Sequence, residues 1–435
     1  MKNTHATKVC FLAFLLVISG RIITATTASM TEDRKLVILH EQTFGGAEVE
    51  YNYAMINASD GGYIMAGHTS SFGAGLSDAW VVKVDIEGNH QWNSTFGGAE
   101  SDVVISIIPT PDGGYAMTGI IESWGYGEWD AWLIKIDNEG QMQWNETYGG
   151  SERDYGGSLA LTPDGGFIIF GYTESFALGD QDFYLIKTDN SGNIIWNKTY
   201  GGYGSERSGF LILTADEGFL LVGLTGTMAT NTLDVWIVKT DSDGNQLWNR
   251  TIGGVNNDFA YAGISAHDGG YIITGFTESY GAGSSDAWLV KIDQNGNHEW
   301  NRTFGGPALD YTTTIIPTND NGYVLAGRTM SYGAGGEDMW LIKTNALGEL
   351  EFDQTFGGAN ADAAYGVVEN GNEGYSLAGR TSSYGAGAED IWFIRAVFET
   401  ETADGFTYSI MITAIMLFII IRVRVSRFDK KRICY

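Results

Sequence analysis

The chain has 435 residues, and its 53 Asp and Glu against 25 Lys and Arg give a formal net charge of −28. It contains 60 glycines but only five prolines, and its two cysteines are Cys10 and Cys434. The part of the chain between these cysteines must therefore fold without disulfides. The acidic balance excludes nucleic acid as a natural ligand and favours cations.

The first 28 residues have the features of a secretory signal peptide. Lys2 and Lys8 flank an apolar run over 9–19, and Ala25 and Ala28 offer small residues for cleavage. We expect residues 1–28 to be removed, and residues 29–34 to form a short leader. The pattern predicts that the rest of the chain lies outside the cell.

One motif recurs seven times from residue 43 onwards, and each copy starts 52 residues after the last. The copies read TFGGAEVE (43–50), TFGGAESD (95–102), TYGGSERD (147–154), TYGGYGSE (199–206), TIGGVNND (251–258), TFGGPALD (303–310) and TFGGANAD (355–362). Within the unit 97–148, apolar and β-branched runs at 103–109, 115–121, 131–137 and 141–148 are separated by glycine-rich turns. Four short strands in a unit of about 50 residues are typical of one blade of a β-propeller.

The repeat predicts an all-β, seven-bladed β-propeller over 35–397, with four antiparallel strands per blade. The seventh unit lacks a fourth strand, whereas 35–44 (KLVILHEQTF) ends in the same TF as every fourth strand. We expect this N-terminal strand to complete blade seven and close the ring.

Two motifs within the repeat resemble known families. The pattern DxxGxxxW, as in Asp85, Gly88 and Trp92, resembles the tryptophan-docking motif of quinoprotein-type propellers. The longer pattern YGG…DGGYxxxGxTxSxGxGxxDxWLxKxDxxG resembles the extracellular seven-bladed β-propeller repeats of bacteria and archaea. The resemblance covers about 36–397 and implies the fold, but no cofactor site carries over. It implies little about function, because these families include binders and scaffolds.

Three charged positions recur in every unit. The acids that end the GG motif, expected beside the central channel, could hold Ca²⁺ on the axis or accept backbone N–H groups; they are Glu50, Asp102, Asp154, Glu206, Asp258, Asp310 and Asp362. A cation in each third strand needs an acidic partner, which we expect from one of the two acid rings. These predicted structural ion pairs are Asp78 with Lys83, Asp130 with Lys135, Asp182 with Lys187, Asp234 with Lys239, Asp286 with Lys291, Asp338 with Lys343 and Asp390 with Arg395. Any Ca²⁺ is optional, and no cofactor is required.

Ligand-binding residues are expected where the repeat fails. The loop 123–129 (SWGYGEW) holds Trp124, Tyr126 and Trp129, which could stack on sugar rings or contact a protein. The alternative for Trp124 is the aromatic position filled by Phe72 in blade one. Five fourth strands carry glycosylation sequons, at Asn93, Asn145, Asn197, Asn249 and Asn301, although these residues could instead be structural.

The C-terminal end reads as a membrane anchor. A linker (398–405) leads to an uncharged apolar run (406–421), which we expect to form one transmembrane helix. The basic tail 422–435 predicts a cytoplasmic C-terminus. Residues 29–421 keep 52 of the 53 acids but only 16 of the 25 Lys and Arg, so this exterior carries a net charge of −36.

These features predict a single-pass cell-surface protein whose propeller binds an extracellular protein or glycan as an adhesin or receptor-like module. The sequence shows no HExxH or GxSxG motif, so we expect no enzymatic activity. Two alternatives stay open: a cell-envelope component that self-associates, and an extracellular hydrolase with a site at the channel mouth.

Overall fold

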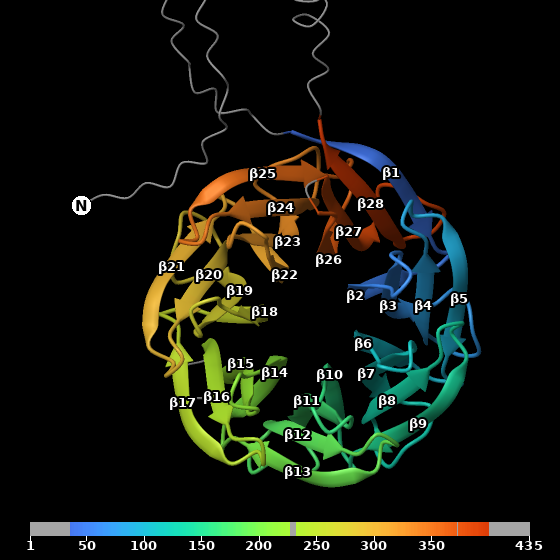
Figure 1. The fold of residues 1–435 in the computed structure, drawn as a ribbon, viewed down its shortest axis with the longest axis vertical. Helices are drawn as coiled ribbons and strands as arrows, with labels where there is room; N and C mark the ends of the chain where they lie inside the picture. The colour runs from blue at the N-terminus through green and yellow to red at the C-terminus, as the bar shows by residue number, and fades with distance from the viewer. Residues whose placement is uncertain (1–34, 227–231, 372, 400–435) are drawn as a thin grey trace, which may run out of the picture. The chain divides into compact units, whose positions relative to one another are not determined.

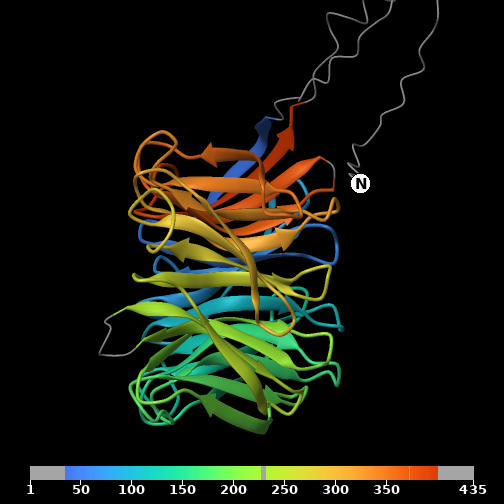
Figure 2. The same ribbon diagram turned by 90° about the vertical axis from the view of Figure 1, so that its left-hand side faces the viewer.

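The computed structural model describes residues 35–226, 232–371 and 373–399, which form a ring of seven four-stranded sheets (Figure 1). The predicted all-β, seven-bladed β-propeller is confirmed. Every sheet is antiparallel, and its strands follow one another from the axis to the rim. The strands run roughly along the ring axis, as the edge-on view in Figure 2 shows.

The strands fall into four sets by their distance from the axis. The innermost strands of blades one to seven are β2 (Glu50–Asn57), β6 (Asp102–Pro109), β10 (Asp154–Leu161), β14 (Ser205–Leu213), β18 (Asp258–Ser265), β22 (Asp310–Pro317) and β26 (Asp362–Glu369). The second strands are β3 (Tyr63–Thr69), β7 (Tyr115–Ile121), β11 (Phe167–Thr173), β15 (Phe219–Gly226), β19 (Tyr271–Thr277), β23 (Tyr323–Thr329) and β27 (Gly374–Thr381). The third strands are β4 (Asp78–Val84), β8 (Asp130–Ile136), β12 (Asp182–Thr188), β16 (Leu233–Thr240), β20 (Asp286–Ile292), β24 (Asp338–Thr344) and β28 (Asp390–Phe398). The outer strands are β5 (His90–Phe96), β9 (Met142–Tyr148), β13 (Ile194–Tyr200), β17 (Gln246–Ile252), β21 (His298–Phe304) and β25 (Leu350–Phe356), with β1 (Leu36–Phe44) in blade seven.

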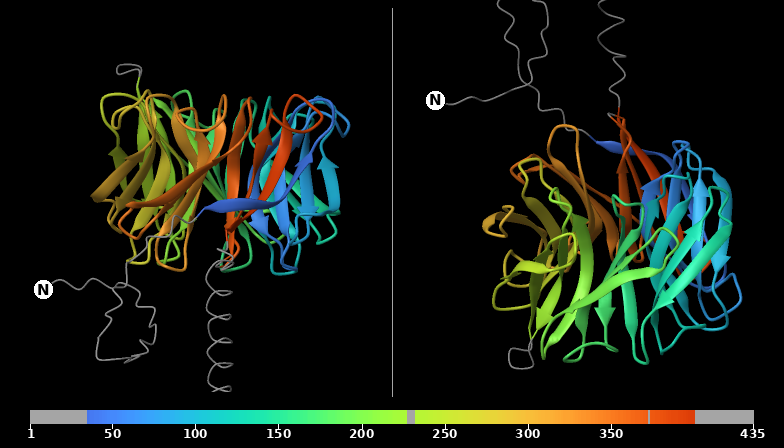
Figure 3. Two further views of the ribbon diagram at one scale, coloured as in Figure 1. Left: turned by 90° about the horizontal axis from the view of Figure 1, so that it is seen from above. Right: turned by 60° about the horizontal axis from the view of Figure 1, so that its bottom comes forward.

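The N-terminal strand closes the ring as predicted. β1 pairs antiparallel with β28, so that Leu36 lies opposite Phe398 and Phe44 lies opposite Ile391. Gln354 of the preceding blade ties this strand down, because its side chain accepts the Leu36 N–H at 2.9 Å and donates to the Leu36 carbonyl at 2.8 Å. The start of β1 and the end of β28 therefore lie on the same face of the ring (Figure 3).

That face is called the bottom face here, and the opposite one is the top face. The top face holds the loops that leave the second and outer strands. Isolated parallel bridges join these loops between neighbouring blades, for example Ser77 with Ser101 and Trp129 with Arg153. Both loop types therefore meet on one side, away from Leu36 and Phe398.

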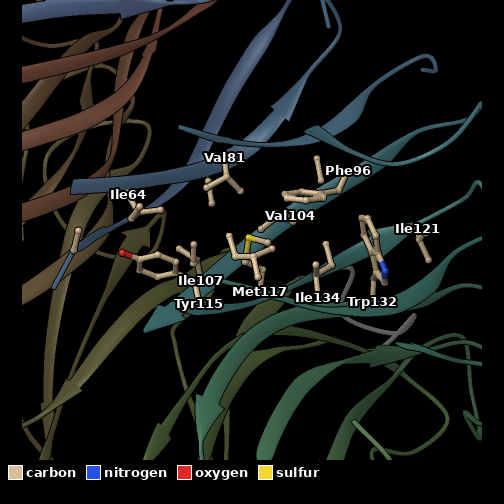
Figure 4. Close-up of a cluster of buried hydrophobic side chains, with 14 residues drawn as sticks. Ile64, Val81, Phe96, Val104, Ile107, Tyr115, Met117, Ile121, Trp132 and Ile134 are labelled. Atoms are coloured by element: carbon tan, nitrogen blue, oxygen red, sulfur yellow. The ribbon is translucent and has the colours of Figure 1, made fainter. Parts of the chain in front are cut away.

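The cores lie between adjacent blades. Third strands such as β4 and β8 are buried along their whole length, because strands cover both edges and neighbouring blades cover both faces. Figure 4 shows one core, in which Ile64 and Val81 of blade one pack with Val104, Met117 and Trp132 of blade two. Continuous apolar runs such as AWVV and AWLI in these strands reflect this two-sided burial.

Outer-strand aromatic residues also join neighbouring blades. A Cβ built on Gly140, in a turn of blade two, would lie 2.6 Å from the Trp92 ring of blade one. Equivalent contacts join Trp144, Trp196, Trp248 and Trp300 to the next blade, and His40 of β1 takes this place against Gly88. The repeated glycine and tryptophan are thus two halves of one contact, since a larger residue at the turn would displace the ring.

Several predicted segments lie outside the described residues: the signal peptide 1–28, the leader 29–34, linker residues 400–405, the helix 406–421 and the tail 422–435. Within the described ranges, no helix is long and apolar enough to cross a membrane.

Candidate functional site

The seven acids that open the inner strands are buried and hydrogen-bonded within the ring. Asp102 accepts the N–H of Gly98 at 2.7 Å with Oδ2, and the N–H groups of Glu122 and Ser123 at 3.0 and 3.1 Å with Oδ1. The second glycine of the GG motif donates in the same way to Glu50, Asp154, Glu206, Asp258, Asp310 and Asp362. Each carboxylate therefore holds together the two loops that meet on the top face.

These contacts correspond to the structural alternative for the ring of acids. Backbone N–H and hydroxyl groups donate to these carboxylates, for example the Thr277 and Ser279 hydroxyls to Asp258. Among the described residues, no group of three or more His, Cys, Asp or Glu is placed to hold a metal ion. Ca²⁺ binding stays a prediction without a site.

The acids that open the third strands have a related role. Asp78 accepts the N–H groups of Ala74 and Gly75 at 2.9 and 3.0 Å. A Cβ on Gly97 would lie 2.4 Å from Asp78 Oδ1 and 2.6 Å from Asp102 Oδ2. The two acids thus lie on either side of the first glycine of the GG motif, which explains why acids and glycine repeat together. The same arrangement surrounds Gly149 between Asp130 and Asp154, and Gly305 between Asp286 and Asp310.

The predicted partners of the third-strand cations were wrong. Lys83 pairs with Asp60, in the turn between the first two strands, instead of with Asp78 or an inner acid. The same pairing joins Lys135 to Asp112 at 2.8 Å, Lys187 to Asp164 at 2.9 Å, Lys239 to Asp216 at 2.9 Å, Lys291 to Asp268 at 3.0 Å, Lys343 to Asp320 at 2.9 Å and Arg395 to Glu373 at 3.2 Å. These side chains point towards the bottom face, whereas the third-strand acids Asp130, Asp182, Asp234, Asp286, Asp338 and Asp390 begin their strands on the top face. The repeated turn sequence DGG could have identified the partner.

The structure separates the three aromatic residues predicted to bind a ligand. Trp124 packs edge-on against Trp132 with ring centroids 5.9 Å apart, as Phe72 packs against Trp80 in blade one. Trp129 is half-buried, and the guanidinium carbon of Arg153 lies 4.8 Å from the centroid of its ring. Trp124 keeps 42% of its surface exposed, and Tyr126 extends furthest into solvent, with 75% exposed.

Sequence reasoning missed three further exposed apolar residues in the top-face loops of the following blades. Leu178 is 72% exposed, Tyr203 is 92% exposed and Val255 is 82% exposed. A Cβ on Gly179 would lie 2.7 Å from the carbonyl carbon of Tyr203, so the loops of Leu178 and Tyr203 touch. Tyr126, Leu178, Tyr203 and Val255 follow one another over blades two to five, and are called the apolar arc.

Comparison of equivalent positions in the repeats would have identified these four residues from the sequence. Tyr126 and Leu178 occupy a loop position where four other blades have Ala74, Ala282, Ala334 and Ala386. Tyr203 and Val255 occupy a position in the GG loop where Ala47, Ala99 and Ala359 stand in other units. The arc therefore consists of large apolar side chains at positions where most other blades carry alanine, with Ser151 and Pro307 as the exceptions in the GG loops.

The backbone beneath the arc is fixed by the third-strand acids. Asp130 accepts the Tyr126 N–H at 2.7 Å, and Asp182 accepts the Leu178 N–H at 2.9 Å. Ala74 makes the same bond to Asp78 at 2.9 Å. The hydrogen bond is thus shared by large and small residues, although the loop of Leu178 has Ala177 where the loops of Ala74 and Tyr126 have the positive-φ glycines Gly73 and Gly125.

Aromatic side chains crowd the axis. Tyr53 and Tyr365 come from adjacent inner strands, with ring centroids 6.3 Å apart. Burial raises the pKa of Tyr53 above its usual range, and the nearby hydroxyls of Tyr155 and Tyr365 add to the shift. Near the top face, Arg380 pairs with Glu389 and lies 3.1 Å from Glu337. The seven inner acids all accept hydrogen bonds, and burial raises the pKa values of Asp154 and Glu206.

The sequon residues lie on the outer strands, where Asn93, Asn197 and Asn249 are exposed and Asn145 and Asn301 are half-buried. Asn93 and Asn145 accept the indole N–H groups of Trp80 and Trp132 at 3.3 and 3.0 Å. Asp353, which belongs to no sequon, accepts the Trp340 N–H at 2.8 Å. The repeated position therefore has a structural role of its own, and glycosylation stays a prediction.

Comparisons with known proteins support the fold. No protein family model matches the chain. It is 25% identical over 165 residues to the regulatory protein FlaEY of Caulobacter vibrioides, a match that spans 32% of this chain and only 17% of that protein. Among solved structures, it resembles the WD40 domain of Neurospora crassa Pan2 with a TM-score of 0.52 at 10% identity, over 84% of this chain and 97% of the domain. A puromycin hydrolase is similar over 77% of this chain and 51% of its own, with a TM-score of 0.49 at 13% identity.

The class of protein is thus a seven-bladed β-propeller. The similarity to solved structures shows that fold alone. The quinoprotein-type and extracellular relationships predicted from the repeat remain resemblances.

Proposed function

We propose that this chain is a membrane-anchored, cell-surface binding module whose top face takes an extracellular protein. The observation that carries the proposal is the apolar arc, and above all Tyr126, which is 75% exposed where four other blades have alanine. The loops of Leu178 and Tyr203 touch, and exposed apolar side chains that lie together mark interaction sites more often than isolated ones do.

A protein fits the arc better than a glycan does. Sugar recognition relies on aromatic rings, but Leu178 and Val255 are aliphatic, Arg153 lies over the Trp129 ring, and Trp124, although 42% exposed, packs edge-on against Trp132. Tyrosine together with aliphatic side chains is typical of protein interfaces. A role as an adhesin or receptor follows from this composition combined with the predicted cell-surface location.

The geometry of the ring is compatible with the predicted anchor. Phe398 ends β28 on the bottom face, and the apolar run 406–421 begins eight residues later. An anchor there would place the bottom face towards the membrane and the arc away from it. We propose a binding rather than a catalytic role because the exposed apolar side chains of the arc carry the proposal.

The proposal is tested by incorporating a photo-crosslinking amino acid into this protein in intact cells and by identifying the proteins that become crosslinked to it. It is introduced at position 126 or 178, and at the matched positions 282 and 334, where the alanine N–H makes the same hydrogen bond to a third-strand acid. We expect discrete crosslinked proteins at 126 and 178 and none at 282 and 334. Equal crosslinking at all four positions, or none at any, would refute a binding role for the arc.

A further inference from the structure

The chemistry of the partner can be inferred from the charges around the apolar arc, an inference that rests on the proposed function. The top-face loops of blades two and three and the loop that leads into blade two carry many acids: Glu100, Glu122, Glu128, Glu152, Glu174 and Asp180. The cations in the same region are Arg153 and Arg207. Six acids against two arginines leave an excess of four negative charges beside Tyr126, Leu178 and Tyr203.

The two arginines are already engaged. Arg153 pairs with Glu128 at 2.9 Å and lies over the Trp129 ring. Arg207 donates from Nε to the Gln181 side chain at 3.1 Å. Within the described part of the chain, Glu100, Glu122, Glu152 and Asp180 have no cation within ion-pair distance. These carboxylates are therefore available to a partner.

We infer that the apolar arc binds a basic amphipathic polypeptide segment, with apolar side chains on Tyr126, Leu178 and Tyr203 and with Lys or Arg facing the surrounding acids. Charge complementarity supports this partner over others. A second copy would bring the same acidic loops face to face, on an exterior that carries −36 in total. Nucleic acid and anionic lipid would be repelled in the same way.

The arc suits such a segment because it is preorganised. The hydrogen bonds from Tyr126 and Leu178 to Asp130 and Asp182 fix the loop backbones before any partner arrives. Binding then costs little ordering of the loops, and affinity comes from the side chains. The attraction of the acids should increase the association rate and should weaken with salt.

The test uses two synthetic peptides of about 18 residues, which span roughly 27 Å as a helix. Both carry the same leucine face, and the opposite face is lysine in one and glutamate in the other. Binding to the full chain is measured by biolayer interferometry. The arc variant Y126A/L178A/Y203A removes the apolar side chains, and a control variant I195A/L247A/L350A removes similar exposed side chains from the outer strands.

We expect the lysine peptide to bind the wild type and the control variant equally, and the arc variant at least about tenfold more weakly. Raising the salt from about 0.05 to about 0.5 M should weaken binding to the wild type, and the glutamate peptide should not compete. Equal binding of the lysine peptide to the arc variant would overturn the inference, because attraction to the acidic surface in general would then explain it.

Other outcomes overturn the inference in different ways. If the glutamate peptide binds as well as the lysine peptide, the charge assignment is wrong. If neither binds, the partner has another chemistry, while crosslinks at positions 126 and 178 would still support the proposed function. If sedimentation shows dimers of the wild type that the arc variant loses, the partner is a second copy of the chain.

Discussion

In the ion pairs near the bottom face, we expect replacement of the acid to cost more stability than replacement of the lysine. Lys239 has 5% of its side chain exposed, whereas its partner Asp216 has 57% exposed. Replacing Asp216 leaves a buried ammonium whose remaining hydrogen-bond acceptor, among the described residues, is the Thr240 carbonyl at 2.7 Å. Replacing Lys239 instead leaves a carboxylate that water can solvate.

The structure sets the expected magnitudes. Removing one member of a buried pair costs about 3–5 kcal/mol, and we expect the lower value, about 3 kcal/mol, for Asp216→Asn because the aspartate is half exposed. The loss is limited to about 4.6 kcal/mol at pH 7, because a lysine with a usual pKa near 10.4 can lose its proton instead. Lys239→Met replaces the buried charge by an apolar side chain of similar length and should cost about 1 kcal/mol or less.

Blade six supplies a matched control. Lys343 contacts Asp320 at 2.9 Å and also Glu351 at 2.8 Å. Asp320→Asn therefore leaves one carboxylate beside the ammonium, and the expected loss falls to about 1 kcal/mol, the value of one hydrogen bond.

Calorimetry at pH 7 measures the difference. A ring of roughly 360 residues has an unfolding entropy of about 0.8 kcal/mol/K, so these losses correspond to Tm decreases of about 4 °C for Asp216→Asn and about 1 °C for Asp320→Asn. Equal decreases for the two aspartates would refute the reasoning, as would a larger decrease for Lys239→Met than for Asp216→Asn.

Four further predictions concern the turns, the glycines, the sequons and the anchor. The pKa of Asp112 is about 2, because Lys135 and Thr110 donate hydrogen bonds to it. Its contribution to stability is present above about pH 4 and is lost as the pH falls towards 2. Over this pH range, the Tm of a Lys135→Met variant should fall less than the Tm of the wild type. Alanine is strained at both Gly97 (φ +153°) and Gly113 (φ +87°), but Gly97→Ala should lower the Tm more, because a Cβ at 97 would also lie 2.4 Å from Asp78 Oδ1, whereas a Cβ at 113 has no atom within 4 Å. In a host that glycosylates, Thr95→Val removes the sequon of Asn93 and should reduce the mass by one glycan; an unchanged mass would show that this sequon is not used. Truncation after residue 405 should move the protein from carbonate-washed membranes to the soluble fraction, and a truncated chain that stays with the membranes would contradict the predicted anchor.

The sequence predicted most of the fold because the 52-residue period fixes both the strand number and the blade number. The tryptophan of DxxGxxxW meets the turn glycine of the next blade, and the strand before the first GG motif completes the last sheet. The partner of each third-strand cation was missed for a physical reason. The period of the repeat shows which acids recur, but not which of them lies close to the third-strand cation. The register of β3 with β4 places Lys83 beside the turn that holds Asp60.

The sequence analysis chose Trp124, Tyr126 and Trp129 because their loop is rich in aromatic residues. A sequence does not show which of these rings pack against other side chains. Trp124 and Trp129 are large and irregular in the repeat, yet Trp132 and Arg153 cover part of their rings. Leu178 and Tyr203 lie in otherwise ordinary loops. Their departure from alanine becomes clear only when equivalent positions of the repeats are compared.

The repeat also makes the arc unusually testable. The loop of Tyr126 has the same hydrogen bond to a third-strand acid as the loops of Ala74, Ala282, Ala334 and Leu178. Alanine at position 126 or 178 is therefore the residue that the same loop position carries in four other blades, and we expect no cavity from the change. Trp129→Ala lacks this property, because it would uncover Arg153 and remove packing. A loss of binding in Y126A/L178A with an unchanged Tm would thus report on the partner, whereas the same loss in a Trp129 variant could reflect a changed loop.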